Sequence, residues 1–295
     1  MTKPDPKACV MGHPVAHSRS PLIHNHWLKT LGIAGTYELM DLTPEQFPGF
    51  IAALGSNGFA GGNVTVPHKE AAFAAVGKRD AAAEAIGAVN TLWLADGVLF
   101  GGNSDAHGFI ANLDQTAPGW DVDGGRAVIL GAGGSARAAA YAFSNRGIRT
   151  ALINRTRARA DEIALHFGAL VSAHDNDALP GLLAGADVLV NCTSCGMVGK
   201  PPLEIDLGPL KQSAVVYDVV YVPLETALLA QARQRGHRTV DGLGMLLQQA
   251  GYGFQKWFGA KTTVTPALRA LIEADIIAKT ASQASCQPPF EPIET

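Results

Sequence analysis

Short apolar runs without polar alternation recur through the second half of the chain. Such runs are typical of parallel strands that are buried on both faces. The predicted strands lie at 127–130, 150–153, 169–171, 187–190, 214–219 and 238–240. Segments rich in alanine and leucine separate them and read as helices. Strands and helices in this alternation predict a doubly wound, Rossmann-type α/β sheet.

The first hundred residues also alternate strands and helices, but with a different pattern. Strands are predicted at 8–11, 36–40, 59–66, 88–94 and 98–102, and helices at 20–31, 44–54 and 81–86. Asp96-Gly97 between the last two strands is a strong hairpin signal. No glycine-rich turn follows any of these strands, so the sequence predicts a separate α/β substrate domain.

These patterns divide the chain into three parts. Residues 1–104 are expected to form the substrate-binding and catalytic domain, and 105–241 the Rossmann domain. Residues 242–295 are expected to supply helices that return to the first domain. The proline-containing tail from about residue 282 is expected to be disordered.

A glycine turn follows the strand at 127–130 directly. Gly131, Gly133 and Ala136 fit the G-x-G-x-x-G/A pattern, and an alanine-rich segment comes next. The first glycine permits the tight turn, the second admits a pyrophosphate, and the small third residue lets helix pack on strand. Because a helix N-terminus favours an anion, this strand–turn–helix predicts a dinucleotide site.

The next strand indicates which dinucleotide binds. It ends at Asn154-Arg155, where an NAD site would carry Asp or Glu for the ribose 2′-hydroxyl. A guanidinium binds a 2′-phosphate, whereas a carboxylate would repel it. The alternative is a solvated basic helix start, but basic residues oppose the dipole there. The sequence therefore predicts NADP.

Bulk properties exclude several classes of protein. The chain has 295 residues and a net charge of -3 without a long basic run, which argues against a nucleic-acid partner. Residues 1–6 lack the apolar core of a signal peptide, and no stretch is long enough to span a membrane. We therefore expect a cytoplasmic protein. Cys192 and Cys195 form a lone C-x-x-C without further ligands, so no metal site is predicted.

Four polar residues are candidates for binding a substrate or for catalysis. Ser20 precedes Pro21 and reads as a helix N-cap, whereas Ser18 has no such duty. Both hydroxyls would suit a substrate carboxylate. Lys69 lies in the first turn of a helix, where the dipole disfavours a cation unless a carboxylate or substrate is near; the alternative is a solvent-facing lysine. Asp105 opens another helix and could be an ordinary N-cap.

Seven blocks in order resemble the shikimate dehydrogenase family. They are 17–21, 63–69, 87–91, 103–105, 131–136, 154–156 and 242–250. The resemblance covers nearly the whole chain. It implies reversible reduction of 3-dehydroshikimate to shikimate by NADPH, in the pathway to chorismate and the aromatic amino acids.

The resemblance also implies roles for individual residues. Ser18 and Ser20 would hold the substrate carboxylate with help from Tyr221, and Lys69 and Asp105 would be the acid–base pair. The ring hydroxyls would bind Thr65, Asn90, Asp105 and Gln249. The cofactor would be lined by Gly131, Gly133, Gly134, Ser135, Ala136, Asn154, Arg155, Thr156, Arg159, Thr193, Met197, Val219, Gly242 and Met245.

Some positions depart from the family pattern. His68 stands where an aromatic residue is usual, and Ser104 stands where threonine is expected. Gln248 and Gln249 are adjacent, so the substrate-binding glutamine is ambiguous by one; counting from Met245 favours Gln249. None of these changes removes a chemical group that the reaction needs.

Three other functions remain open at this stage. The nearest is a quinate or broad quinate/shikimate dehydrogenase. A catalytically silent NADP-binding regulator is another, although it would be expected to have lost Lys69 and Asp105. A methylene-tetrahydrofolate-type dehydrogenase is weaker, because it would not need two serines for a carboxylate. The sequence leaves the choice between a monomer and a homodimer open.

Overall fold

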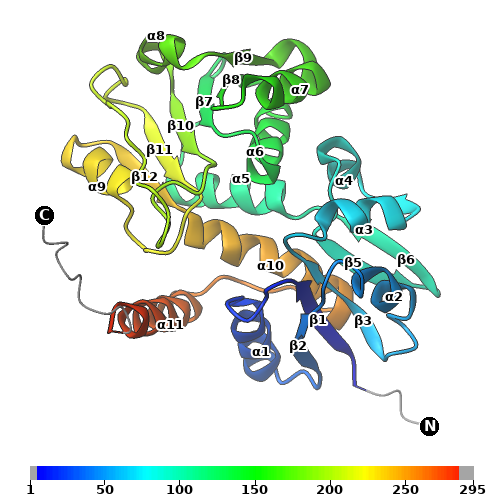
Figure 1. Ribbon diagram of the computed structural model, residues 1–295. Helices are drawn as coiled ribbons and strands as arrows, with labels where there is room; N and C mark the ends of the chain where they lie inside the picture. Colours follow the sequence, from blue (N-terminus) through cyan, green and yellow to red (C-terminus); the bar gives the residue numbers. More distant parts are fainter. Residues whose placement is uncertain (1–4, 286–295) are drawn as a thin grey trace, which may run out of the picture.

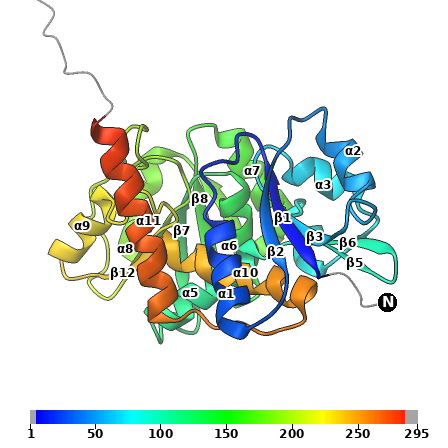
Figure 2. The same ribbon diagram turned by 90° about the horizontal axis from the view of Figure 1, so that it is seen from below.

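The computed structural model describes residues 5–285, which form two lobes around two sheets (Figure 1). Helices α5 (Asp105–Thr116) and α10 (Gly242–Phe258) run between the lobes. Figure 2 shows the same molecule from below, with α11 (Pro266–Ser285) beside α1 (Ser20–Leu31). Within residues 5–285, no helix combines the length and apolar character that crossing a bilayer requires.

The first sheet has the strand order β2-β1-β3-β5-β6-β4 and mixes parallel with antiparallel pairs. Its strands are β1 (Lys7–Gly12), β2 (Thr36–Asp41), β3 (Phe59–Val64), β4 (Lys78–Arg79), β5 (Thr91–Ala95) and β6 (Val98–Gly102). Helices α2 (Phe47–Ala52), α3 (Lys69–Ala75) and α4 (Ala81–Ile86) join α1 in this lobe. The predicted hairpin forms, and both turn residues have positive φ, 51° at Asp96 and 75° at Gly97.

The second sheet has the order β12-β11-β10-β7-β8-β9, and every pair is parallel. Its strands are β7 (Arg126–Leu130), β8 (Arg149–Ile153), β9 (Val171–His174), β10 (Val188–Asn191), β11 (Val215–Asp218) and β12 (Arg238–Asp241). Its helices are α6 (Gly134–Ser144), α7 (Arg157–Phe167), α8 (Leu179–Gly185) and α9 (Ala227–Gln234). The order reverses between β7 and β10, as in doubly wound dinucleotide-binding sheets, so the predicted Rossmann-type fold is confirmed.

Strand β7 shows why its sequence has no polar alternation. Ala127 and Ile129 pack into one apolar cluster with α5 and α6, whereas Val128 and Leu130 pack into another with α8 and α9. Successive side chains of a strand point to opposite faces, and both faces here are covered by helices. A strand in this position needs apolar residues throughout.

Helices α5 and α10 approach each other through two glycines. A Cβ at Gly108 would lie 2.7 Å from the Cβ of Gln249, and a Cβ at Gly244 would lie 1.8 Å from Oδ1 of Asn112. The Asn112 amide donates to the Tyr217 hydroxyl and to the carbonyl of Asp241, so it is not free to move. Helix α10 also contacts β3 and β5 of the first sheet. One helix therefore touches both lobes.

Several element boundaries differ from the sequence prediction. Strand β3 covers 59–64 rather than 59–66, and β5 covers 91–95 rather than 88–94. Helix α2 covers 47–52 rather than 44–54, and β9 covers 171–174 rather than 169–171 because a 3₁₀ turn occupies 168–170. Helix α11 continues to residue 285, beyond the predicted start of the disordered tail at about 282. The remainder of that tail, 286–295, lies outside the described residues.

We expect Gly244→Ala to lower the free energy of unfolding by about 2 kcal/mol or more, because the added methyl group would displace the Asn112 amide. Urea denaturation measures this. Gly181→Ala is the matched control, since nothing lies within 4 Å of a Cβ added to Gly181 in α8. Alanine there should be neutral or stabilise by up to about 1 kcal/mol. Equal destabilisation by both substitutions would contradict the close approach of α5 and α10.

His24 in α1 gives a second prediction, on pH. Its ring is fully buried, stacks on Tyr37 with centroids 4.1 Å apart, and has no hydrogen-bond partner among residues 5–285. Burial lowers the pKa of His24 to about 3, against a smaller opposing contribution from Asn63. Because the unfolded chain binds this proton at a pKa near 6.5, stability falls as the pH falls through that value.

From pH 7 to pH 5 this proton should cost the wild type about 2 kcal/mol of unfolding free energy. His24→Phe keeps a flat ring against Tyr37 and removes the titration. The variant should therefore lose about 2 kcal/mol less stability than the wild type over the same range. Urea denaturation of both proteins at each pH measures this difference. If the unfolding free energies of the two proteins depended on pH in the same way, His24 would not be buried in the neutral form.

Candidate active site

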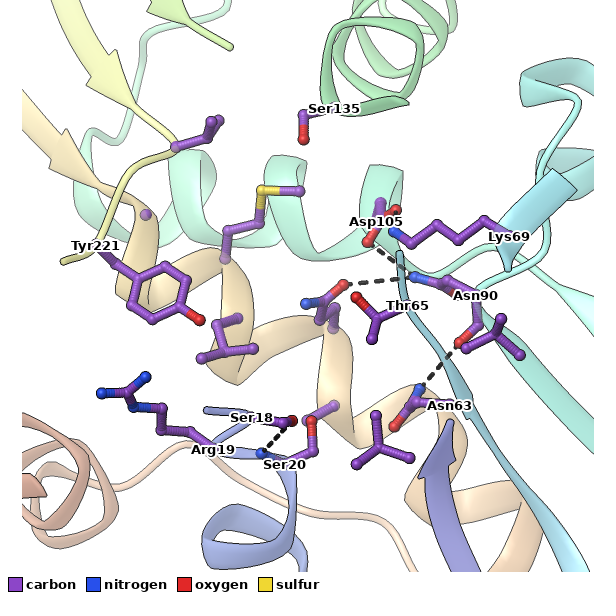
Figure 3. A pocket seen from close by; sticks show the side chains of 18 of the residues that line it. Ser18, Arg19, Ser20, Asn63, Thr65, Lys69, Asn90, Asp105, Ser135 and Tyr221 are labelled. Atoms are coloured by element: carbon purple, nitrogen blue, oxygen red, sulfur yellow. Dashed lines mark hydrogen bonds and ion pairs between the residues drawn. The ribbon is translucent and has the colours of Figure 1, made fainter. Parts of the chain in front are cut away.

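A cavity of about 240 Å³ lies between the two lobes, where the loop before α1, the end of β3 and helix α10 meet (Figure 3). Its walls include every residue predicted to bind substrate. These are Ser18, Ser20, Thr65, Lys69, Asn90, Asp105, Tyr221 and Gln249. Their sequence positions span more than two hundred residues, so the fold brings them together.

The predicted acid–base pair is in direct contact. Nζ of Lys69 donates to Oδ2 of Asp105 at 2.6 Å, and Nδ2 of Asn90 donates to Oδ1 of Asp105 at 2.8 Å. The side chains of Lys69 and Asp105 are 27% and 10% exposed, which leaves the ammonium reachable from the cavity. Lys69 is the first residue of α3, and the carboxylate offsets the unfavourable field of that helix end. A purely solvent-facing lysine is therefore excluded.

The amide of Asn90 has one permitted orientation. Its Oδ1 accepts from the Thr91 hydroxyl at 2.9 Å and from the Ser104 N–H at 2.9 Å. Nδ2 therefore points at Asp105 and, at 3.5 Å, at Oε1 of Gln249. Ser104 also donates its hydroxyl to Oδ1 at 3.2 Å, so serine keeps the hydroxyl that threonine would supply. The N-cap of α5 is Ser104, and Asp105 is the first helical residue.

The two adjacent glutamines have different surroundings. Gln249 lines the cavity, whereas Gln248 does not; its Nε2 donates to Oε1 of Gln115 in α5. His68, beside Lys69, is 2% exposed and stacks on Phe47 with ring centroids 4.4 Å apart. Its ring also bonds the Leu42 carbonyl at 2.7 Å. The imidazole thus fills the place of a flat aromatic ring and adds a hydrogen bond.

The opposite end of the cavity carries hydroxyl groups. The prediction that Ser20 caps α1 is wrong: helix α1 begins at Ser20, its N-cap is Arg19, and the Ser20 N–H donates to the Ser18 hydroxyl at 3.3 Å. The sequence indicated no structural role for Ser18, but its hydroxyl accepts the hydrogen bond from this N–H. Burial raises the pKa of Tyr221, partly offset by the positive charge of Arg19, so the Tyr221 phenol is a hydrogen-bond donor at neutral pH.

A second cavity of about 870 Å³ adjoins the first, and His17, Arg19, Ser135, Val219 and Tyr221 line both. Of the predicted cofactor residues, Ser135, Thr193, Met197 and Val219 line this second cavity. Gly242 and Met245 line the first cavity, together with Ser135 and Val219. The remaining predicted cofactor residues border neither: Gly131, Gly133, Gly134, Ala136, Asn154, Arg155, Thr156 and Arg159.

The glycine turn at the start of α6 has the geometry of an anion site. Gly131 has φ of 108°, and a Cβ there would lie 3.1 Å from the backbone carbon of Cys192. Nothing lies within 4 Å of a Cβ added to Gly133 or Gly134. Helix α6 begins at Gly134 without a side-chain cap, so its first N–H groups are available. This open turn fits a pyrophosphate.

Two arginines without acidic partners among the described residues follow the end of β8. Arg155 and Arg159 are exposed, and neither has an acidic partner within 4 Å among residues 5–285. Arg157 between them is neutralised by Asp161 and Asp175, each at 2.9 Å. Asn154 donates to the Thr156 carbonyl at 2.8 Å, which shapes the loop. The residues present therefore fit a phosphate beside the dinucleotide turn.

Sequence reasoning missed several residues that line the first cavity. Asn63 is one: its Oδ1 accepts from the Tyr37 hydroxyl at 2.7 Å, and its Nδ2 donates to the Asn90 carbonyl at 3.2 Å. The signal was available, because Asn63 and Thr65 lie on one face of the strand predicted at 59–66. Arg19 also lines the cavity, and it stands between the two serines of the motif.

Comparison with known families matches both lobes. Residues 10–92 match the family model for the shikimate dehydrogenase substrate binding domain. Residues 113–198 match the model for shikimate / quinate 5-dehydrogenase. Among curated proteins, a shikimate dehydrogenase (NADP(+)) of Mesorhizobium japonicum is 59% identical, covering 95% of this chain and 100% of the relative. A protein of the same name from Brucella abortus is 55% identical, covering 92% and 94%.

Solved structures give the same picture. A shikimate 5-dehydrogenase from Thermus thermophilus, in complex with NADP(H) and shikimate, is 34% identical with a TM-score of 0.81, covering 92% of this chain and 99% of that one. A quinate dehydrogenase from Corynebacterium glutamicum, in complex with NAD, is 28% identical with a TM-score of 0.84 over the same shares.

Proposed function

This chain belongs to the shikimate dehydrogenase family, and we propose that it catalyses the reversible reduction of 3-dehydroshikimate to shikimate with NADPH. The observation that carries this function is the contact of Lys69 with Asp105 inside a cavity lined by hydroxyl and amide groups. The cavity lies beside an open glycine turn that suits a dinucleotide. The names of the relatives at 54–59% identity support the same reaction and the same cofactor.

The two ends of the substrate would bind different groups. Ser18, Ser20 and Tyr221 offer hydroxyl donors at one end of the cavity, which suits the carboxylate. Thr65, Asn90, Asp105 and Gln249 would hold the ring hydroxyls. The reacting oxygen would lie against Lys69. Two anchored ends fix the ring relative to the ammonium, and such positioning supplies much of the rate.

Lys69 would act at the oxygen that changes charge. Bound NADPH supplies the hydride, and negative charge then develops on the carbonyl oxygen of the substrate. The Lys69 ammonium stabilises this oxygen and donates a proton to it; in the oxidation of shikimate the same nitrogen takes the proton back. Asp105 holds the ammonium in place, while Asn90 keeps the carboxylate from rotating away.

For the cofactor, we propose that the turn from Gly131 to Ala136 binds the pyrophosphate, with Gly133, Gly134 and Ser135 at the helix end. Asn154, Arg155, Thr156 and Arg159 would hold the adenosine ribose and its 2′-phosphate. The reactive end of the cofactor would be lined by Thr193, Met197, Val219, Gly242 and Met245. Residues 1–104 with the returning helices 242–285 would then serve the substrate, and 105–241 the cofactor.

Quinate is the alternative substrate to test, because a quinate dehydrogenase in complex with NAD shares the fold. Oxidation assays at alkaline pH with shikimate or quinate, each with NADP or NAD, separate the functions. We expect fast NADP reduction with shikimate. Turnover mainly with quinate and NAD would overturn the proposal, and tight NADP binding without turnover would indicate a regulator.

Substitution of Lys69 tests the catalytic role. We expect Lys69→Met to lower kcat by about 10²- to 10⁴-fold, because the developing charge loses both its stabilising ion and its proton donor. The Kd for NADP should stay within about twofold, since Lys69 is not among the residues proposed to hold the cofactor. Lys78→Met, an exposed lysine of the same lobe, is the control and should retain activity. An unchanged kcat with weakened substrate binding would contradict proton transfer by Lys69.

Arg155 tests the cofactor preference. Arg155→Ala should raise the Kd for NADP by about 10- to 100-fold, because a charge-assisted hydrogen bond to phosphate is lost. The Kd for NAD, which has no 2′-phosphate, should change little. Arg157→Ala removes an equal charge two residues away, but that charge is already paired with Asp161 and Asp175. If both substitutions weakened NADP binding equally, general charge rather than a contact from Arg155 would be responsible.

A further inference from the structure

Arg19 is a buried cation between the two serines that line one end of the cavity. Its side chain is 7% exposed, and it borders both cavities. Figure 3 shows the side chain at the same end as Ser18, Ser20 and Tyr221. A buried guanidinium is costly unless its N–H groups are bonded, so its partners indicate its role.

The guanidinium joins the loop to a distant helix. One terminal nitrogen, Nη1, donates to the His17 carbonyl at 2.8 Å, and Nε donates to Oδ2 of Asp275 at 3.2 Å. Asp275 lies on α11, 256 positions further along the chain, and its side chain is 21% exposed. Its other oxygen accepts from Lys279 at 3.0 Å. Asp275 thus anchors the guanidinium, and the guanidinium anchors the backbone at His17.

The anchored backbone controls both serine hydroxyls. Arg19 is the N-cap of α1, so its conformation determines where α1 begins and where Ser20 points. The Ser18 hydroxyl accepts from the Ser20 N–H, which ties one serine to the other. Apolar packing of Ile272 and Ile276 of α11 with Ile23 of α1 holds the two helices together. The position of Asp275 is therefore fixed relative to the loop.

We propose that Arg19, held by Asp275, is a positioning residue that sets the Ser18 and Ser20 hydroxyls for the substrate carboxylate. This role rests on the proposed function, because it assumes that the two serines bind that carboxylate. Asp275 borders neither cavity, so it would act only through Arg19. A residue on the C-terminal helix would thereby contribute to substrate selection.

Asp275→Asn tests the role, because it removes the charge that orients the guanidinium and keeps the shape of the side chain. We expect the KM for shikimate to rise about tenfold, with kcat within about threefold, because binding of the carboxylate is lost equally in the ground and transition states. The Kd for NADP should not change.

The methyl ester of shikimate separates positioning from a general structural defect. The ester has no carboxylate charge, so misplaced serines should impair it less than shikimate. The ratio of kcat/KM for shikimate to kcat/KM for the ester should fall about fivefold in Asp275→Asn, because the charge-assisted hydrogen bonds to the carboxylate are weakened. Glu273→Gln is the matched control: it removes an ion pair with Arg269 on the same helix and should leave the ratio unchanged.

Arg19→Lys provides a second variant should Asp275→Asn fold poorly. Lysine keeps the charge but is a single ammonium without the fork of donors, so we expect a similar rise in KM. An unchanged KM in both variants would overturn the proposal. An equal fall in kcat/KM for shikimate and its methyl ester, accompanied by a lower Tm, would also overturn it. Wild-type enzyme that fails to oxidise shikimate would instead reject the proposed function, and this role with it.

Discussion

The contact of Lys69 with Asp105 is the interaction on which the rest of the site depends. Moving two charges out of water costs several kcal/mol for each ion, and only close partners offset that cost. Both carboxylate oxygens of Asp105 are bonded, one to Lys69 and one to Asn90. The Asn90 amide must therefore keep one orientation, and Thr91 and Ser104 enforce it. The polar residues around the pair thus have a structural duty in addition to any contact with substrate.

The same pair also lies where the two lobes join. Asp105 is the first residue of α5, and α5 leads directly into the second sheet. Glycines at 108 and 244 let α10 approach α5 closely, and α10 carries Met245 and Gln249 into the first cavity. A shift between these helices would move Gln249 relative to the carboxylate. The packing between the lobes therefore also constrains the geometry around the Lys69–Asp105 pair.

Local pattern was enough for most of the fold, and the family resemblance supplied part of the lining of the first cavity. Unbroken apolar runs predicted the second sheet because its strands are covered on both faces, and the family resemblance implied eight of the residues that line the first cavity. Interactions between distant segments were out of reach. Asp275, which binds Arg19, is 256 residues away, and the hydrogen bond from the Ser20 N–H to the Ser18 hydroxyl depends on how the loop turns. The starts of helix α2 at residue 47 and of strand β9 at residue 171 were predicted wrongly because short turns precede them.

Similarity of fold alone does not distinguish NAD from NADP as the cofactor. The quinate dehydrogenase in complex with NAD and the shikimate dehydrogenase in complex with NADP(H) have nearly the same likeness to this chain. The shared fold supplies an open glycine turn, which suits the pyrophosphate of either dinucleotide. The distinction has to come from side chains beyond that turn. At the end of β8 this chain has no carboxylate to accept a ribose hydroxyl, and it leaves Arg155 and Arg159 unpaired among the residues described while Arg157 is neutralised. The proposal places the 2′-phosphate at Arg155 and Arg159 because these two arginines are unpaired within residues 5–285, rather than because this loop holds many arginines.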